Sequence, residues 1–367
     1  MRWNCDNRVR FPCVAIGTRR YVVAVVAAVT MVGPAASESL RLQVPVETQP
    51  IEIQARPITH FQTGSPGVRR FGKLEFRGGL VLSSSNESFG GWSGLTIDAD
   101  GQRLLAVSDK GSWLSAEIAF RDDVPVGLVK ARLGSLLALK GRKIDKKRDL
   151  DAEALAPLEG NLQRGLMLIG FERNHRIGVF PVVDGSVLAP LRYLRLPAEA
   201  RRMRSNSGFE AVAVMKGGPH KGSVVAFSER FPGPTTQHTG WIWINDVAHR
   251  MTLADLGGFD ITDAVSLTDG TLILLERRFR WTEGVKMRIR RLEASAIKPN
   301  AVLEGEVLIE ADLASAIDNM EALAAHRGRN GETVLTIMSD NNFNTLLQRN
   351  LLLQFVLIDD ARAARRP

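Results

Sequence analysis

Residues 317–357 read IDNMEALAAHRGRNGETVLTIMSDNNFNTLLQRNLLLQFVL, and this stretch decides the fold. One apolar run opens at Glu321, a second closes at Asp340, and the glycine-bearing turn RGRNG separates them. Two such runs around a short turn are typical of an antiparallel β-hairpin. The pattern therefore predicts that the carboxylates of Glu321 and Asp340 face each other at the open end of the hairpin.

The same pattern recurs in four earlier stretches. Each has an opening residue, a turn and a closing acid, and the predicted pairs are Ser93 with Asp109, Glu153 with Glu172, Glu210 with Glu229, and Asp263 with Glu276. The five opening positions are 60, 57, 53 and 58 residues apart. A repeat of about 55 residues is typical of blades or solenoid turns. The sequence therefore predicts an all-β fold, a β-propeller of four-stranded antiparallel blades.

The number of blades depends on how the ends of the chain are used. Five hairpins are visible, whereas the chain after residue 36 is long enough for six units of about 55 residues. Further alternating segments fit the outer strands: 115–120, 176–183, 239–244, 286–292 and 346–357. We expect six blades, with five as the alternative. A sixth blade would use residues 38–83 and be completed by the C-terminal strand Leu351–Leu357.

The first 36 residues have the layout of a secretory signal. Five arginines precede the apolar run 21–32, and small residues follow it. A run of twelve residues is shorter than the about 20 that a helix needs to span a bilayer, although a retained short anchor is an alternative. We expect export to the periplasm or the medium, by the general or the twin-arginine route, with no stable membrane span after cleavage.

The remaining sequence suggests one large domain. We expect a signal peptide (1–36), an extended N-terminal arm (37–70), the propeller domain (71–358) and a disordered basic tail (359–367). Half of the net charge of +8 lies in the signal, so the mature chain gives little reason to expect binding to nucleic acid. Both cysteines, Cys5 and Cys13, also lie in the signal, which leaves the mature chain without a disulfide.

The repeated acids predict a metal site. If the innermost strand of every blade starts at the same mouth of the central channel, the opening and closing acids gather there. Like charges opposed across strands repel each other, so the cluster needs a cation, a proton or interleaved basic residues. Calcium takes six to eight oxygen ligands in flexible geometry and suits such a ring. The candidate metal ligands are Asp109, Glu153, Glu172, Glu276, Glu321 and Asp340.

A basic or amide residue follows each closing acid. Arginine side chains bind phosphate and carboxylate oxygens in a bidentate manner, so a mouth with arginines and divalent cations favours a small anionic substrate, best a phosphate ester. The candidate substrate-binding residues are Lys110, Arg173, Arg278, Asn341 and Arg349. The candidate catalytic residues are Glu210, Glu229, Arg230 and Arg277, with the arginines stabilising developing charge.

Three alternatives remain open. The acid–arginine repeats could form a ring of ion pairs that joins neighbouring blades. The protein could be a non-catalytic periplasmic propeller that binds a ligand or a protein at the same mouth. A serine esterase using Ser93 is a third alternative. The chain has no G-x-S-x-G, H-E-x-x-H or P-loop motif, and its six histidines show no i, i+4 pair.

Several modules together resemble the phytase-like family, whose members are described as having esterase-like activity of phytase. They are GGWSGLTIDADGQRLLAVSDKGSW, DLDAEALAPL, NSGFEAVAV, FSERF, LLERRF, DNMEALAA and SDNNFNTLLQRNLLLQF. The resemblance covers roughly residues 71–357. It implies a β-propeller related to calcium-dependent phytases, and hydrolysis of phosphate or carboxyl esters. The resemblance supplies no separate catalytic motif. The repeated acids and arginines named above are the residues to which the family's activity would be assigned.

Overall fold

The structure is a computed structural model, and it describes residues 47–233 and 236–358. All described residues belong to one compact unit, which lies within residues 42–367. The expected signal peptide, both cysteines and the expected C-terminal tail lie outside the described residues. The architecture reported below is therefore that of this compact unit.

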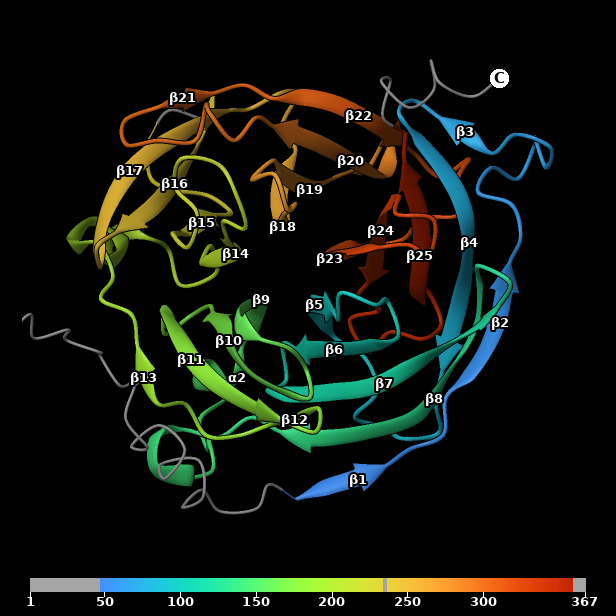
Figure 1. Ribbon diagram of the computed structural model, residues 1–367, viewed down its shortest axis with the longest axis horizontal. Helices are drawn as coiled ribbons and strands as arrows, with labels where there is room; N and C mark the ends of the chain where they lie inside the picture. The colour runs from blue at the N-terminus through green and yellow to red at the C-terminus, as the bar shows by residue number, and fades with distance from the viewer. Residues whose placement is uncertain (1–46, 234–235, 359–367) are drawn as a thin grey trace, which may run out of the picture. The chain divides into compact units, whose positions relative to one another are not determined.

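Five β-sheets are arranged as blades around a central channel (Figure 1). The innermost strands are β5 (Trp92–Ile97), β9 (Ala152–Gly160), β14 (Phe209–Val214), β18 (Asp260–Ser266) and β23 (Met320–Arg327). The second strands are β6 (Arg103–Ser108), β10 (Arg164–Phe171), β15 (Val224–Ser228), β19 (Leu272–Arg280) and β24 (Thr333–Ser339). The predicted β-propeller with antiparallel blades is confirmed. The expectation of six blades is wrong, and the alternative of five is right.

The expected alternating segments supply the third strand of each blade but not the fourth. The third strands are β7 (Ser112–Arg121), β11 (Arg176–Val183), β16 (Gln237–Ile244), β20 (Gly284–Leu292) and β25 (Asn350–Leu357). The fourth strands are β8 (Val124–Ser135), β12 (Ser186–Val187), β17 (Val247–Ala254), β22 (Glu306–Ala311) and β4 (Leu74–Ser83). Short edge strands are β1 (Thr48–Pro50), β2 (Gln54–Ile58), β3 (Arg70–Phe71), β13 (Arg192–Tyr193) and β21 (Val302–Leu303). The only helical turns in the described chain are η1 (Leu139–Gly141), α2 (Lys147–Leu150) and η2 (Ala198–Arg202).

The two ends of the propeller unit meet in one sheet. Strand β25 pairs along its length with β4, so the N-terminal segment supplies the fourth strand of the fifth blade. The predicted pairing partner of the C-terminal strand is therefore correct, but it completes an existing blade instead of starting a sixth. Strands β1 and β2 only extend the edges of the first and fifth blades, and a single edge strand cannot form a blade. Pro50 and Pro57 sit in these edge strands, where a missing backbone donor is tolerated.

The hydrophobic core lies between the blades. Five buried clusters each draw their side chains from two neighbouring sheets, so that every pair of adjacent blades shares one cluster. Trp92, Trp113 and Trp241 are fully buried in these clusters, as expected for residues that pack blades together. This packing fixes the five innermost strands around the channel and thereby positions their ends.

The channel is closed at the level of the innermost strands. Small and branched side chains from all five strands surround a residual space of about 10 Å³, among them Leu95, Leu155, Ala213, Ala264 and Leu323. A space of this size is at the lower limit for one water molecule. The channel therefore does not form an open passage through the propeller at this level.

Candidate functional site

Each innermost strand carries a β-bulge close to its first residue. The pairing with the second strand skips one residue in every blade, and the skipped residues are Ser93, Glu153, Glu210, Thr262 and Glu321. A bulge leaves its extra residue unpaired and redirects the side chain, and bulges are common next to active sites. The five bulged residues form equivalent positions at the channel mouth, and three of them are glutamates.

The closing acids lie one residue beyond the last paired residue of the second strand. In the second blade, Ala152 pairs with Phe171, and the backbone N–H of Glu172 then donates to the carbonyl oxygen of Asp151 (2.9 Å). Equivalent bonds hold Asp109 (3.0 Å), Glu229 (3.1 Å) and Asp340 (2.9 Å). The predicted direct pairing of opening and closing acids is therefore wrong, because the bulge shifts the register, but both sets of acids still reach the mouth.

The fourth blade departs from the predicted pattern. Its bulged residue is Thr262, and the position equivalent to the other closing acids is occupied by Arg277. Asp263 is buried and accepts hydrogen bonds from the backbone N–H groups of Ala264 (2.7 Å) and Leu323 (2.6 Å). Two pairs of residues have the same midpoint in this hairpin: Asp263 with Glu276, and Thr262 with Arg277. The spacing of the sequence therefore cannot show which of the two pairs lies at the channel mouth.

Glu276 lies away from the other predicted metal ligands. Its side chain is fully buried within the fourth blade, where it is paired with Arg290 and lies 3.7 Å from Arg288. The two arginines already neutralise this carboxylate. The structure therefore does not bring Glu276 to the mouth with the other acids.

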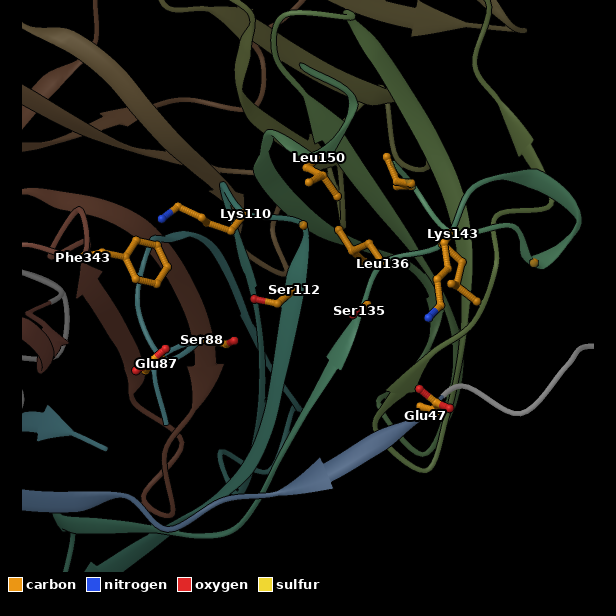
Figure 2. A pocket seen from close by; sticks show the side chains of 14 residues that line it. Glu47, Glu87, Ser88, Lys110, Ser112, Ser135, Leu136, Lys143, Leu150 and Phe343 are labelled. Atoms are coloured by element: carbon orange, nitrogen blue, oxygen red, sulfur yellow. The ribbon is translucent and has the colours of Figure 1, made fainter. Parts of the chain in front are cut away.

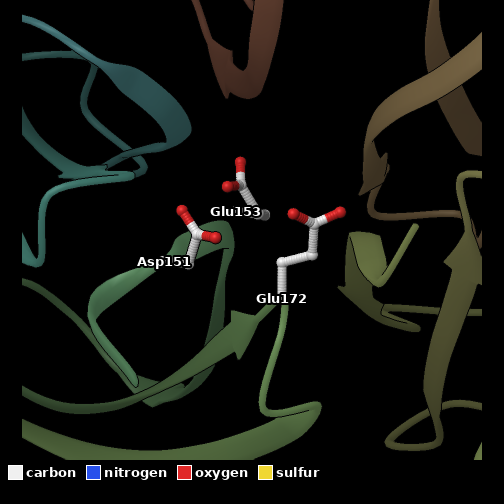
Figure 3. A group of neighbouring side chains, drawn as sticks. All are labelled: Asp151, Glu153 and Glu172. Atoms are coloured by element: carbon white, nitrogen blue, oxygen red, sulfur yellow. The ribbon is translucent and has the colours of Figure 1, made fainter. Parts of the chain in front are cut away.

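The remaining acids form one group, which we call the acid cluster. It comprises Asp109, Asp151, Glu153, Glu172, Glu210, Glu229, Glu321 and Asp340. Carboxylate oxygens of Asp151, Glu153 and Glu172 lie within 4.8 Å of one another, and Figure 3 shows these three side chains gathered together. Oxygens of Glu172, Glu210 and Glu229 form a second such set, so Glu172 belongs to both.

Asp151 was not among the predicted ligands. It lies just before β9, and the bulge at Glu153 interrupts the regular alternation of side chains, so strand periodicity does not bring the two residues together. The signal in the sequence is the closeness of the two acids in the segment DAE at residues 151–153.

Burial and mutual repulsion raise the pKa values of the acid cluster. Burial, followed by the charges of Asp151 and Glu229, raises the pKa of Glu172 to about 7. Burial and the charge of Asp340 raise the pKa of Glu321 to about 7, against the opposing effect of Arg277. The pKa values of Glu153 and Glu210 are raised well above their usual range by burial and then by neighbouring carboxylates. A cluster with such values needs protons or cations to be stable at neutral pH.

Arg277 lies among these acids. Its Nε atom lies 3.1 Å from Oε1 of Glu321, and its charge opposes the rise that burial causes in the pKa values of Glu229 and Asp340. Glu153 and Glu210, by contrast, form no ion pair with any basic residue in the described parts of the chain. The cluster therefore contains carboxylates that the protein itself does not neutralise.

The other predicted arginines are engaged in ion pairs. Arg230 binds Asp260 of the next blade with both ends of its guanidinium group (3.0 and 2.6 Å). The ion pairs of the others are Arg173 with Asp151, Arg278 with Glu283 (2.6 Å) and Arg349 with Asp318 (3.2 Å). Arg230 and Arg277 bridge neighbouring sheets, as expected if the arginines join blades. This alternative does not explain Glu153 and Glu210, which have no basic partner among the described residues.

Lys110 and Asn341 have different surroundings. The ammonium group of Lys110 lies 3.6 Å from the ring centroid of Phe343, and both side chains line a cavity of about 550 Å³ (Figure 2). Asn341 is 1% exposed, and its Oδ1 atom accepts a hydrogen bond from the backbone N–H of Phe343 (3.2 Å). Lys110 is thus exposed at this cavity, whereas Asn341 shapes the loop that carries Phe343.

Two further cavities border the acid cluster. One of about 770 Å³ is lined in part by Arg277, Asn319 and Glu321. The other, of about 360 Å³, is lined in part by Glu229 and Arg230. Ser93 is buried, and its hydroxyl group donates to the carbonyl oxygen of Gly91 (3.4 Å) without a hydrogen bond to a histidine or carboxylate of the described residues. The space for a ligand lies at the acids and not at Ser93.

The chain was also compared with known proteins. A model of the phytase-like family, described as "Esterase-like activity of phytase", matches residues 87–343. The endo-arabinase from Bacteroides thetaiotaomicron VPI-5482 is similar in structure, with a TM-score of 0.47, 10% identity, and coverage of 75% of this chain and 96% of that chain. The structure titled "Structure of Dos1 propeller" has a TM-score of 0.33 and 8% identity, and the match covers 78% of this chain and 75% of that chain. No curated protein matches the chain.

Among the described residues, no helix has the length and apolar character needed to cross a bilayer.

Proposed function

The chain belongs to the phytase-like family, and from this premise we propose that it is an exported hydrolase that cleaves phosphate esters at the acid cluster, with calcium as its cofactor. The observation that supports this proposal most strongly is the pair Glu153 and Glu210. Both are held at bulges in the channel mouth, and neither is paired with a basic side chain within the described residues. Both side chains are half-buried, and a carboxylate that is largely removed from water without a basic partner is costly unless it takes up a proton or binds a cation.

The acid cluster fits a divalent cation. Calcium binds carboxylate oxygens at about 2.3–2.6 Å, so two oxygens bound to one ion lie up to about 5 Å apart. Within each of the two sets that share Glu172, the carboxylate oxygens lie within 4.8 Å of one another. Asp151, Glu153, Glu172, Glu210 and Glu229 would hold the metal. A calcium ion there would offset the negative charge of a phosphate ester and make a water molecule more acidic.

The basic residues of the mouth would orient the anionic group of the substrate. Arg277 is partly buried beside Glu321, and a guanidinium group in such a place stabilises charge more effectively than one in water. Lys110 follows Asp109 in the chain and faces the cavity that contains Phe343. The two residues therefore offer positive charge at two separate cavities. We infer that Arg173, Arg230 and Arg349 act mainly through their ion pairs.

The proposed location outside the cytoplasm rests on the N-terminal sequence. Basic residues, an apolar run of twelve residues and small residues follow one another within residues 1–36. A calcium-dependent hydrolase would also find a suitable ion supply in the periplasm or the medium. Sequencing the N-terminus of the protein recovered from the producing cells tests this part: an intact residue 1 in the exported fraction would contradict signal cleavage.

The hydrolase proposal is tested with the purified mature protein. We expect turnover of an aryl phosphate in Ca²⁺ and its loss in EGTA. Glu210→Gln should lower the rate at least about 100-fold, since it removes one unpaired carboxylate of the site. The matched control is Glu159→Gln, an exposed carboxylate at the opposite end of β9. Turnover that is absent with aryl phosphate and aryl acetate in every metal condition would refute the hydrolase and favour a ligand-binding propeller. Labelling of Ser93 by a fluorophosphonate would instead favour a serine esterase.

A further inference from the structure

The lining of the 770 Å³ cavity is mixed. Arg277 and Glu321 line it where it meets the acid cluster, and apolar side chains come from Phe279, Val285, Leu313, Ile317 and Leu347. The remaining lining is polar and comprises Asp318, Asn319, Asn342, Asn344, Gln348 and Arg349. A volume of this size lies within the range of pockets that bind small organic ligands, about 300–1,000 Å³. The cavity therefore joins the charged centre of the proposed site to an apolar wall.

The apolar wall is unusually exposed. Phe279 is 54% exposed, Leu313 is 61% exposed and Leu347 is 80% exposed. Trp281 packs its edge against Phe279 at a centroid distance of 6.0 Å and is 93% exposed, whereas Trp92 and other core tryptophans are fully buried. Single exposed apolar residues are ordinary, but a group of them around one cavity marks a binding surface.

Three separate segments bring these side chains together. Phe279 stands near the end of β19, Leu313 lies in the connection from β22 to β23, and Leu347 lies in the loop between β24 and β25. Gly284 permits the close approach of Leu313, because a Cβ atom added at this glycine, whose φ is +72°, would collide with the leucine side chain. Two blades thus contribute to one wall, and the wall adjoins the metal-binding acids through Arg277.

The charges near the apolar wall are already paired. Arg278 binds Glu283 (2.6 Å), Lys286 binds the same glutamate (2.8 Å), and Arg349 binds Asp318 (3.2 Å). A polyanion that carried phosphate groups on every side would meet paired charges and apolar carbon here. An ester with one anionic group and one apolar group matches a cavity lined both by Arg277 and by apolar side chains.

We propose that the 770 Å³ cavity binds the apolar alcohol portion of the substrate, and that the substrate class is a phosphate ester of an alkyl or aryl alcohol. The proposal rests on the function proposed above, because it places the phosphate group at the acid cluster beside Arg277. Phe279, Leu313 and Leu347 are then specificity-determining residues that contact the alcohol. The inference concerns which ester binds, independently of how fast it is cleaved.

The test is a binding titration with a series of alkyl phosphates in the presence of Ca²⁺. Methyl, butyl and octyl phosphate are added below their micellar concentrations, and binding is followed by calorimetry and by the fluorescence of the exposed Trp281. Burial of each methylene group strengthens binding by up to about fourfold, so we expect at least about a tenfold gain from butyl to octyl phosphate. Product inhibition or turnover is not needed for this measurement.

The variant Phe279→Ser with Leu347→Ser should remove most of the gain with chain length. The matched control is Val302→Ser, which replaces an apolar side chain of 67% exposure on β21, outside this cavity. Circular dichroism of each variant confirms that the fold is retained. If chain length has no effect, or if inositol phosphates bind more tightly than octyl phosphate, the inference is wrong.

Two further outcomes separate the inference from its premise. Chain-length-dependent binding without turnover of any ester would support the apolar cavity and refute the hydrolase. Turnover of aryl phosphate with binding that ignores chain length would support the hydrolase and refute the cavity assignment. A third outcome would overturn the proposal. If the protein binds phosphatidylcholine vesicles through Trp281 and does not bind monomeric octyl phosphate, the apolar wall contacts a membrane surface.

Discussion

Glu172 is the carboxylate that both sets of candidate ligands share, and its neutralisation offers the sharpest test of the acid cluster. The substitution Glu172→Gln keeps the size of the side chain and an oxygen that can accept the hydrogen bond from the backbone N–H of Gly208 (3.3 Å). It removes only the charge. We expect metal-free protein to become more stable and the calcium-loaded protein to lose part of its stabilisation.

The magnitude follows from the pKa of Glu172, which burial raises from 4.5 to about 7. A group with a raised pKa in the folded state stabilises the protein below its unfolded pKa, and this stability is lost as the pH rises through about 7. The shift corresponds to about 3 kcal/mol at pH 8, which solvent at the open mouth reduces to about 1–2 kcal/mol. At pH 5 the same substitution should gain less than about 1 kcal/mol.

The effect on calcium has the opposite sign. Removal of a ligand shared by two sets should weaken Ca²⁺ binding about tenfold or more. At saturating Ca²⁺, a tenfold weaker binding constant lowers the ligand's contribution to stability by about 1.4 kcal/mol. The stabilisation on adding Ca²⁺ should therefore shrink by at least about this amount.

Urea unfolding at pH 5 and pH 8, each in EGTA and in Ca²⁺, measures all of these quantities. Glu159→Gln on the same blade is the matched control, because this exposed side chain lies at the far end of β9. The reasoning fails if Glu172→Gln destabilises the metal-free protein at pH 8, or if its effect is equal at the two pH values. An unchanged response to Ca²⁺ would show that Glu172 does not bind the ion.

Three other substitutions test the surroundings of the cluster. Arg230→Ala breaks the ion pair with Asp260 between the third and fourth blades. Because the arginine is largely exposed, we expect the free energy of unfolding to fall by at most about 1 kcal/mol. Urea unfolding should show this loss at low salt and not at high salt. Gly91→Ala should lower the free energy of unfolding by more than about 2 kcal/mol, because it adds left-handed strain (φ +69°) and places a Cβ atom against Asp109 of the acid cluster. The control Gly222→Ala has a similar φ (+88°) but open space around it, so it should cost only about 1 kcal/mol. Equal losses in the two variants would contradict the close approach at Gly91. Arg277→Gln should steepen the loss of metal-free stability between pH 5 and pH 8, because the guanidinium opposes the repulsion among the acids, and an unchanged pH profile would argue against that role.

The hairpins, and with them the propeller, could be predicted from the sequence because they depend on local patterns. Alternating apolar residues on either side of a short turn predict each innermost pair of strands, and the recurrence at about 55 residues predicts blades. The acids Glu153, Glu210 and Glu321 occur at the same point of three repeats, and the structure places them at equivalent bulges. The composition of the mouth was therefore largely readable from the spacing of the acids.

The blade count and the arginine partners depend on contacts between distant segments. The pairing of β4 with β25 closes the ring after five blades, and nothing in the local pattern of residues 74–83 states which sheet they join. The partner of Arg230 is Asp260, which the next blade supplies, so the sequence order alone does not show that this arginine is occupied. Ion pairs of this kind are decided when blades pack against each other.

The register at the channel mouth was decided by single-residue bulges. A bulge moves one residue out of the ladder without changing the apolar pattern around it, so Thr262 with Arg277 and Asp263 with Glu276 are equivalent in the sequence. The backbone geometry sends Arg277 to the acids and buries Glu276 against Arg290. The sequence by itself thus determined the repeating hairpins and the acidic character of their ends, because these are properties of neighbouring residues. Only the tertiary structure decided which charges meet, because that depends on one-residue register shifts and on the closure of the ring.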